Sequence, residues 1–279
     1  MVKSIALIGC GTIGKEIAFA VDIGKIKNAS IVALFDKVKS AAEELSSNLH
    51  NNNPHIYSDF SEFISSPSFR DTDVVVEAAS QDAVNTFCKI ILENGKSLII
   101  MSVGALADQS LWSDLLNKAY QNTSRIYIPT GAIAGIDAIR SVKHLIESVT
   151  LTTTKNPKAL ADAPFFNSTG FDPFKINQKR LIYEGNADDA VKKFPSNVNI
   201  AAVLGLAGIG IENTKVRIVI DPNTDRNQHE ISVNGKFGEI TISVSNIPSA
   251  TNPKTSFLAV LSAIECLRSA CDNHIRIGT

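Results

Sequence analysis

A glycine-rich segment near the N-terminus has the residue types and the spacing that bind phosphate groups. Gly9, Gly11 and Gly14 form a GxGxxG motif that directly follows an apolar run and opens a helical pattern. That context is typical of a dinucleotide-binding turn. Gly9 allows a tight turn, Gly11 lets the backbone approach a pyrophosphate, and Gly14 lets the helix pack closely on the strand. The N–H groups at the helix start, including those of Thr12 and Ile13, are then predicted to hold the phosphates.

An acidic residue at the end of the second apolar run indicates which dinucleotide is preferred. Asp36 stands where a carboxylate accepts hydrogen bonds from the adenosine ribose hydroxyls and repels a 2′-phosphate. This position favours NAD as the cofactor. The adjacent Lys37 is a cation that could tolerate the phosphate, so NADP stays possible. The competing interpretation is a glycine turn next to a surface aspartate, with no cofactor.

The elements that must position these residues alternate in the first half of the chain. Strands are predicted at Ser4–Ile8, Ile31–Phe35, Val74–Val76, Leu98–Met101 and Ile126–Ile128. Helices are predicted between them at Ile13–Ile23, Val38–Leu49, Asp82–Leu92 and Leu111–Ala119. This alternation predicts an α/β fold with an N-terminal Rossmann domain, a doubly wound parallel sheet with right-handed crossovers.

Small residues follow the fourth and fifth predicted strands. In a sheet of this kind the nicotinamide lies across the carboxyl ends of those two strands. We therefore expect Ala79 and Ser80, and likewise Val103 and Gly104, to line the cofactor site. Ordinary strand-to-helix turns are the alternative.

The pattern changes after about Gly131 and predicts a second, α+β domain. The predicted elements are an alternating strand at Glu147–Lys155, a loop from Asn156 to Asn177, a strand at Arg180–Tyr183, a helix opened by Asn186, an apolar helix at Val198–Leu206 and a strand at Thr214–Ile220. Asn234-Gly235 predicts a hairpin with a type I′ turn, because both central residues of that turn need positive φ. The chain closes on an amphipathic helix, Ser256–Cys271, whose apolar stripe comprises Phe257, Leu258, Leu261, Ile264 and Leu267.

We expect residues 1–131 and 252–279 to form the Rossmann domain, with residues 132–251 inserted as the substrate domain. The formal net charge is -1 and no basic patch is evident, so a nucleic-acid partner is not expected. No apolar run reaches membrane length, which favours a cytoplasmic protein. Cys10, Cys88, Cys266 and Cys271 form no CxxC pair and lack zinc-ligand spacing, so we expect reduced thiols and no metal site.

Eight segments taken together carry a resemblance to a known family. They read GCGTIG, EAAS, MSVGAL, PTGAIAGIDAI, TTTKNP, FPSNVNIAA, RNQHEI and NPKTS, and they run from the first strand to the last helix. This ordered set resembles the L-aspartate dehydrogenase family. The resemblance implies a homodimer that oxidises L-aspartate with NAD(P), giving iminoaspartate and then oxaloacetate and ammonia. It also implies that the iminoaspartate feeds NAD biosynthesis.

The resemblance further implies roles for individual residues. The catalytic histidine falls on His229, and the cofactor-contacting alanine and asparagine fall on Ala132 and Asn199, with Asn197 as a rival for the second position. A substrate with two carboxylates needs cations or convergent N–H and hydroxyl donors. The candidates that the matching segments hold are Lys155, Asn156, Asn197, Lys254, Thr255 and Ser256. Solvated lysines and a serine that only caps a helix are the competing interpretations.

The residues themselves also point to His229. An amino-acid dehydrogenase needs a base for the ammonium proton and a group that activates water against the imine, and histidine can serve both steps. Of the five histidines, His229 is the one predicted in a polar loop between two strands of the second domain. An exposed loop histidine is the alternative. An ordinary imidazole would make the rate fall below a pKa of about 6.5.

Two other functions are compatible with this plan. One is a different two-domain reductase, of the dihydrodipicolinate reductase or homoserine dehydrogenase type, which fold analogy alone cannot separate. The other is a non-catalytic NAD sensor, which would need an output surface or a DNA-binding module. Aspartate-dependent reduction of NAD discriminates among all three.

Overall fold

The computed structural model describes residues 2–195, 198–249, 255–272 and 274. The chain divides into two compact units. The first holds residues 2–129 and the described residues from 260 onward, and the second holds residues 130–259. Each unit has its own sheet.

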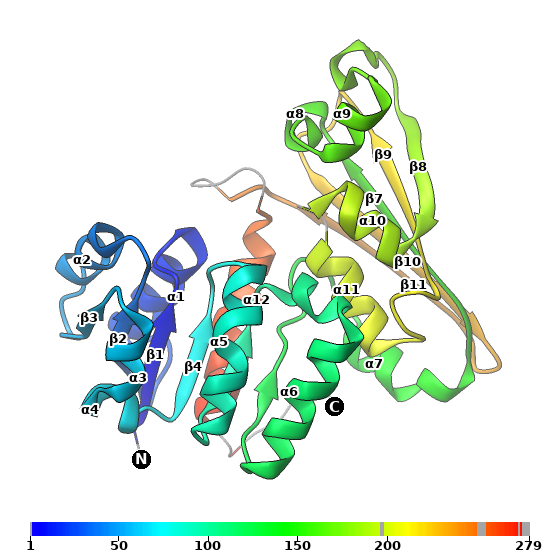
Figure 1. Ribbon diagram of the computed structural model, residues 1–279. Coiled ribbons are helices and arrows are strands. Elements are labelled where there is room, and N and C mark those ends of the chain that lie inside the picture. The colour runs from blue at the N-terminus through cyan, green and yellow to red at the C-terminus, as the bar shows by residue number, and fades with distance from the viewer. Residues whose placement is uncertain (1, 196–197, 250–254, 273, 275–279) are drawn as a thin grey trace. The chain divides into compact units, whose positions relative to one another are not determined.

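The first unit is built on a six-stranded parallel sheet (Figure 1). Its strands are β1 (Lys3–Ile8), β2 (Ala29–Phe35), β3 (His55–Tyr57), β4 (Val74–Glu77), β5 (Ser97–Ile100) and β6 (Ile126–Tyr127). Their order in the sheet is β3-β2-β1-β4-β5-β6. This is the strand order of dinucleotide-binding domains, with the ligand crevice at the point where β1 and β4 lead in opposite directions. The predicted α/β Rossmann fold is confirmed.

The helices of the first unit are α1 (Thr12–Asp22), α2 (Lys39–Ser47), α3 (Phe60–Ser65), α4 (Pro67–Arg70), α5 (Gln81–Glu93), a 3-10 helix η1 (Val103–Ala107), α6 (Gln109–Gln121) and most of α12 (Phe257–Cys271). The short elements β3, α3 and α4 were absent from the sequence prediction, because three to six residues are too few to establish a period.

Helix α12 packs into the core of the first unit, where its Ala263 and Leu267 join Ile5 of β1 and Ile17 of α1. The predicted apolar stripe of this helix was wrong in part. Phe257 and Leu261 are each 45% exposed, whereas the buried positions are Val260, Ala263, Leu267, Ala270 and Cys271. The buried face contains small alanines, which let the helix approach the sheet, so large side chains alone misplaced it.

The second unit is built on a mixed five-stranded sheet in the order β11-β10-β7-β9-β8. Its strands are β7 (Ile146–Lys155), β8 (Arg180–Asn186), β9 (Thr214–Ile220), β10 (Asn227–Gly235) and β11 (Gly238–Asn246). β7 and β9 are parallel, and the other neighbours are antiparallel. Helices α10 (Ala187–Lys193) and α11 (Val198–Ala207) contact β9, while α7 (Ile136–Ser141) and the 3-10 helix η2 (Lys143–Leu145) precede β7.

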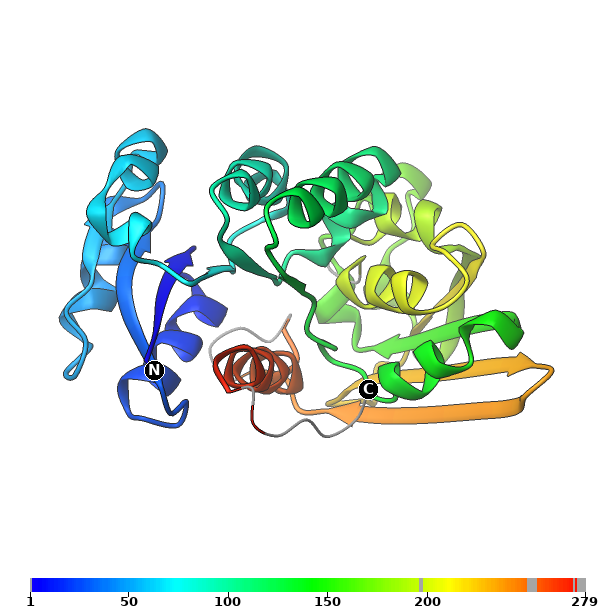
Figure 2. The same cartoon turned by 90° about the horizontal axis from the view of Figure 1, so that it is seen from below.

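The predicted hairpin exists, but its turn lies two residues further along the chain. β10 and β11 are the two long neighbouring strands drawn in orange in Figure 2, and Gly235 pairs with Gly238 across the turn residues 236–237. The expected type I′ turn at Asn234-Gly235 is therefore wrong. A Cβ on Gly235 would overlap the backbone of Leu145 and Ile146, so this glycine serves close strand approach instead of positive φ.

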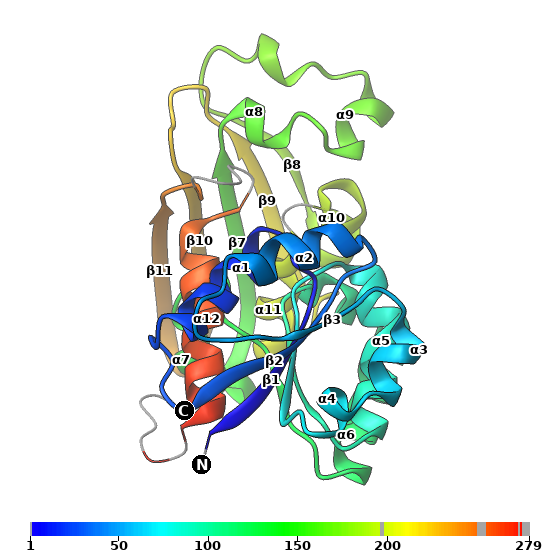
Figure 3. The same ribbon diagram turned by 90° about the vertical axis from the view of Figure 1, so that its left-hand side faces the viewer.

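The segment predicted as a loop after β7 contains three short helices. They are α8 (Pro157–Leu160), α9 (Pro164–Thr169) and a 3-10 helix η3 (Pro173–Lys175), and α8 and α9 lie at the top of Figure 3. Each of the three begins with proline, whose fixed φ suits the first helical position. No helix among the described residues is long and apolar enough to cross a membrane.

Candidate active site

The three motif glycines have three different environments in the first unit. Gly9 has φ +95°, and a Cβ there would lie 2.7 Å from the backbone carbonyl of Ala78. A Cβ on Gly14 would overlap the carbonyl oxygen of Gly9, so only glycine lets α1 pack against the turn. A Cβ on Gly11 would meet no atom within 4 Å. The space beside Gly11 is therefore open to a ligand, as the motif predicts.

The start of α1 leaves backbone donors for such a ligand. Gly11 is the N-cap residue and makes no side-chain capping hydrogen bond, and Thr12 and Ile13 occupy the first turn. The first N–H groups of an α-helix have no partner within the helix. Together with the helix dipole, they form a site suited to phosphate oxygens.

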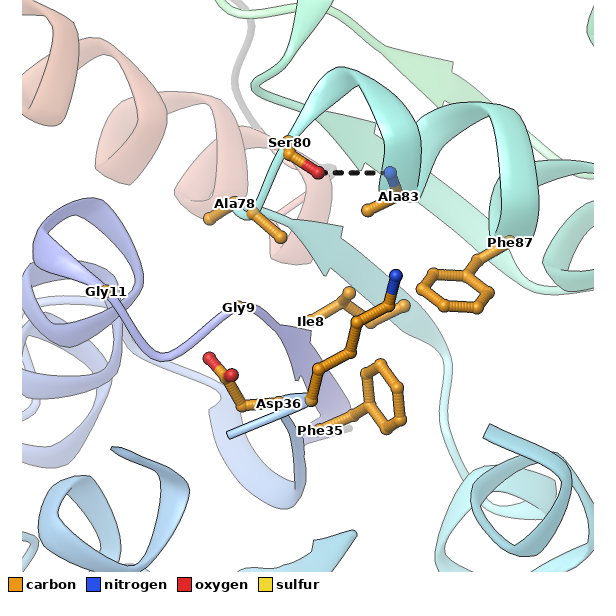
Figure 4. A pocket seen from close by; sticks show the side chains of 11 residues that line it. Ile8, Gly9, Gly11, Phe35, Asp36, Ala78, Ser80, Ala83 and Phe87 are labelled. Atoms are coloured by element: carbon orange, nitrogen blue, oxygen red, sulfur yellow. Dashed lines mark hydrogen bonds between the residues drawn. The ribbon is translucent and has the colours of Figure 1, made fainter. Parts of the chain in front are cut away.

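Asp36 is held in place by the glycine turn itself. Its Oδ2 accepts a hydrogen bond from the Cys10 N–H at 2.8 Å, and its Oδ1 accepts one from the Val38 N–H at 2.8 Å. Figure 4 shows the carboxylate beside Gly9 and Gly11 at the edge of the pocket. Each carboxylate oxygen keeps a further lone pair, so Asp36 can accept from a ribose diol without losing these contacts.

These residues border a cavity of about 270 Å³ in the first unit. Its lining comprises Ile8, Gly9, Gly11, Phe35, Asp36, Lys37, Ala78, Ala79, Ser80, Ala83 and Phe87. Phe35 and Phe87 meet edge to face at 5.4 Å between ring centroids and give the cavity an apolar wall that suits a flat base (Figure 4). Sequence reasoning missed both phenylalanines, which are ordinary core residues by pattern.

The other cofactor candidates of the first unit lie on the loops after β4 and β5. Ala79 and Ser80 line the cavity, and the Ser80 hydroxyl caps α5 by accepting from the Ala83 N–H at 3.2 Å. Val103 and Gly104 are buried in η1, directly after β5. Lys37 pairs with Asp82 at 3.1 Å, where both side chains are well exposed, so the pair contributes little to stability.

His229 is not in a loop, contrary to the prediction. It lies within β10 and is 1% exposed, so the alternative of an exposed loop histidine is also wrong. It pairs with Thr153 of β7, whose Oγ1 is 3.1 Å from His229 Nδ1. Because side chains alternate along a strand, Lys155 and Asn227 share this face. The sheet thus collects Thr153, Lys155, Asn227 and His229 in one buried polar cluster.

Two groups of the cluster point to a ligand. His229 Nε2 is buried and has no hydrogen-bond partner among the described residues. Lys155 is 3% exposed, and no described acidic side chain forms an ion pair with it. Buried charges in proteins are normally paired. A polar, anionic ligand would satisfy both groups.

Burial changes the protonation of both bases. Desolvation, with a smaller contribution from the charge of Lys155, lowers the pKa of His229 from 6.5 to about 3. Desolvation lowers the pKa of Lys155 from 10.5 to about 8. At neutral pH the imidazole is therefore neutral and the lysine is mostly a cation. The expected pKa of about 6.5 for this imidazole assumed that it is solvated, and burial lowers the pKa in the ligand-free protein.

The structure brings one further predicted residue to this cluster. Ser256 is 6% exposed and its Oγ accepts a hydrogen bond from Asn227 Nδ2 at 3.3 Å, while the neighbouring Thr255 is half-buried. Sequence reasoning missed Asn227. Its place two residues before His229 would have identified it once that segment was read as a strand.

The remaining candidates have mixed surroundings. Asn156 caps α8 through its Oδ1, and its Nδ2 donates to the carbonyls of Pro222 and Thr224, so a bond from Nδ2 to a substrate carboxylate would have to replace one of these two. The Ala132 carbonyl accepts from Asn246 Nδ2 at 2.9 Å. Asn199 is exposed on α11. Asn197 and Lys254 lie outside the described residues.

No group of three or more metal-ligating side chains occurs within the described part of the chain. All four cysteines are free thiols. Burial raises the pKa of Cys10 to about 12, so this thiol next to the glycine turn is protonated at neutral pH.

Comparisons with known proteins match each unit separately and the chain as a whole. Residues 137–270 match the model of the aspartate dehydrogenase C-terminal domain, and residues 9–129 match that of the homoserine dehydrogenase NAD-binding domain. An L-aspartate dehydrogenase of Nitrosopumilus maritimus is 45% identical over 99% of this chain and 100% of its own length. The chain belongs to the L-aspartate dehydrogenase family. Another relative, from Methanosarcina barkeri, is also 45% identical, over 99% of each chain.

Solved structures agree with this membership. The crystal structure of aspartate dehydrogenase from Thermotoga maritima is similar with a TM-score of 0.76 and 29% identity, covering 100% of both chains. An archaeal homoserine dehydrogenase in complex with NADPH reaches a TM-score of 0.59 at 13% identity, which shows a shared fold alone. The first unit is an NAD(P)-binding domain. The homoserine dehydrogenase likeness is confined to fold and cofactor domain, so that alternative loses its support.

Proposed function

We propose that the protein is an NAD(P)-dependent oxidoreductase that oxidises L-aspartate to iminoaspartate, which hydrolyses to oxaloacetate and ammonia. The observation that carries this proposal is the buried pair of His229 and Lys155 in the unit that matches the aspartate dehydrogenase C-terminal domain. One member is a neutral base whose Nε2 has no partner among the described residues, and the other is a cation with which no described acidic side chain forms an ion pair. L-Aspartate offers an ammonium proton to the first and a carboxylate to the second.

The residues of the first unit fit the dinucleotide. The open space at Gly11 and the uncapped N–H groups of Thr12 and Ile13 suit the pyrophosphate, and the oriented carboxylate of Asp36 suits the adenosine ribose. When bound, the nicotinamide supplies the acceptor for the hydride that leaves the substrate Cα. Val103 and Gly104 after β5, together with Ala132 and Asn199, stay proposed cofactor contacts.

His229 acts as the general base in this proposal. Nδ1 carries the proton and donates to Thr153 Oγ1, which leaves the lone pair of Nε2 for the substrate. Nε2 takes one proton from the ammonium group, so the amine lone pair can form the C=N bond as the hydride departs from Cα. After that proton has passed to solvent, Nε2 takes a proton from the water that adds to the imine carbon. The adduct then loses ammonia and leaves oxaloacetate.

Lys155 binds a substrate carboxylate and thereby makes the neighbouring His229 more basic. In the ligand-free protein its charge helps to keep the pKa of His229 low. A carboxylate that pairs with Lys155 cancels most of that charge, so His229 becomes a stronger base when the substrate is bound. Ser256, Thr255 and Asn197 are the proposed donors to the second carboxylate, with Asn156 available if it gives up a present contact.

Three finer statements belong to the same proposal. Asp36 supports a preference for NAD over NADP. The family resemblance supports a homodimer formed through the second unit, and a supply of iminoaspartate to NAD biosynthesis. Sedimentation velocity of the purified protein tests the homodimer. Growth of a strain that lacks other sources of iminoaspartate tests the supply to NAD biosynthesis.

The decisive experiment on function is a substrate panel. Purified protein with NAD should form NADH with L-aspartate, as followed by absorbance, and much less with D-aspartate, L-glutamate or L-homoserine. Oxaloacetate and ammonia should appear in amounts equal to the NADH. Turnover of L-homoserine in preference to L-aspartate, or no turnover of any amino acid while NAD still binds, would overturn the proposal in favour of another dehydrogenase or a sensor.

A further inference from the structure

A second buried charge, Glu77, has no role in the chemistry described so far. It is the last residue of β4, at the centre of the first sheet, where it pairs with Ile8 of β1 and Ile100 of β5. Its side chain is 0% exposed. The position is the carboxyl end of the fourth strand, beside the switch point at which such sheets bind their cofactor.

The described hydrogen-bond partners of this side chain donate to it. Oε1 accepts from the N–H groups of Ala79 and Ser80 at 2.9 and 3.0 Å and from the Ser102 hydroxyl at 2.8 Å. Oε2 accepts from the Ser102 N–H at 3.0 Å. Three of these contacts come from backbone N–H groups, which cannot accept the O–H of a protonated carboxyl group, and among the four contacts only the Ser102 hydroxyl could reverse its role. Each carboxyl oxygen accepts at least one backbone N–H, which stabilises the carboxylate, but burial outweighs these hydrogen bonds and leaves the pKa of Glu77 above its ordinary value.

These contacts join two loops that follow neighbouring strands. Ala79 and Ser80 belong to the loop after β4 that lines the cavity, and Ser102 begins the segment after β5. Both loops end in N-caps or helical turns that fix their backbones. Glu77 therefore sets the distance between the two loops on which the nicotinamide is expected to lie.

The described part of the chain supplies no counter-ion for Glu77. No lysine, arginine or histidine among the described residues pairs with it, and its charge contributes to the raised pKa of the buried Cys88 thiol. The four donors stabilise the carboxylate but carry no net charge. When Glu77 is ionised, these donors reduce its negative potential at the carboxyl edge of the sheet but do not cancel its net charge.

We propose that Glu77 is a positioning residue that also selects the redox state of the cofactor, because its buried carboxylate stabilises the positive charge of an oxidised nicotinamide ring. This inference rests on the proposed dehydrogenase function for the place of the ring. The reduced ring is neutral and gains nothing from the carboxylate. Glu77 therefore favours the oxidised cofactor over the reduced one and assists release of the reduced product.

The test compares equilibrium binding of NAD+, NADH and ADP-ribose, by calorimetry, to the wild type and to Glu77→Gln. Glutamine keeps the volume and removes the charge. We expect the ratio Kd(NAD+)/Kd(NADH) to rise on the order of tenfold in the variant, which is the size of effect that one uncompensated charge has in a partly buried site. ADP-ribose lacks the nicotinamide and should bind with nearly unchanged affinity. An equal loss for all three ligands would overturn the proposal, because it would show that Glu77 only holds the loops.

Ser102→Ala is the matched control. It removes the hydroxyl contact to Glu77 and retains the carboxylate, so any loosening of the loops should change both redox forms by the same factor. If Glu77→Gln does not fold, the wild type alone still decides, because NAD+ should bind more tightly than NADH, and the reverse order would contradict the proposal. These measurements contain no aspartate, so a failure of the proposed substrate leaves them interpretable.

Discussion

The low pKa of His229 makes the stability of the protein depend on pH in a predictable direction. The folded state holds this imidazole neutral down to about pH 3, whereas the unfolded chain takes up the proton near the ordinary pKa of 6.5. The contribution of His229 to stability is therefore complete above pH 6.5 and is lost as the pH falls from there toward 3. Because the side chain is 1% exposed, solvent screening does not reduce the effect.

The size of the effect follows from these two pKa values. Between pH 8 and pH 5 the unfolded state takes up a proton at His229 that the folded state does not bind. Because pH 5 lies about 1.5 pH units below the ordinary pKa, this proton lowers the free energy of unfolding by about 2 kcal/mol. His229→Asn cannot bind this proton. The wild type should therefore lose about 2 kcal/mol more free energy of unfolding over this pH interval than His229→Asn does.

Urea unfolding followed by circular dichroism at pH 8 and pH 5 measures this difference. The comparison is between pH dependences, so a general loss of stability in His229→Asn does not affect it. His144→Asn, in the exposed turn before β7, is the matched control and should keep the pH dependence of the wild type. If the wild type and His229→Asn lost equal free energy between the two pH values, His229 would not be a buried neutral base, and the reasoning would fail.

Substitutions at Lys155, at the two motif glycines and at Asp36 test the two units separately. kcat/KM for L-aspartate should fall as the pH rises through about 8, where Lys155 loses its proton. Lys155→Met should lose most of its kcat/KM together with this pH dependence. A wild-type profile that stays flat from pH 7 to 10 argues against a cationic Lys155. Gly14→Ala should lower the free energy of unfolding by about 1–3 kcal/mol or more, because its Cβ would overlap Gly9. Gly11→Ala should fold with nearly unchanged stability and bind NAD more weakly. The opposite order of stability in urea unfolding would contradict the roles given to the two positions. Asp36→Ser should weaken NAD binding and raise the use of NADP relative to NAD, and a wild type that already uses NADP as well as NAD would show that Asp36 does not discriminate.

The first unit could be predicted from the sequence because its signals are local. The glycine turn and the strand–helix alternation depend on residues close together in the chain, and Gly9, Gly11 and Gly14 each meet the steric condition that their spacing implies. The aromatic wall of the cavity could not be read in this way. Phe35 ends β2 and Phe87 lies on α5, and only the tertiary fold brings the two rings together.

The site in the second unit was harder to predict from the sequence, for a physical reason. Asn227 and His229 face inward from β10, so polar residues stand where a strand pattern requires apolar ones, and the segment resembled a loop. The pairing of His229 with Thr153 depends on strands 76 residues apart in sequence. Local pattern placed the hairpin but not its turn, since the demand on Gly235 comes from β7 and not from its neighbours in the chain.

In the proposed mechanism His229 removes the substrate proton during oxidation of L-aspartate. The most direct measurement is kcat for aspartate-dependent NADH formation at pH 8 by the wild type, His229→Ala and His229→Asn, alongside the Kd for NAD. A positioned general base contributes about 10²–10⁴-fold, so both variants should lose kcat by that factor, about 3–5 kcal/mol of activation free energy. Their Kd for NAD should match that of the wild type, because the cavity is lined by residues of the first unit. A His229→Ala variant that retains near wild-type kcat would contradict the account and would leave Lys155 as the next base to test.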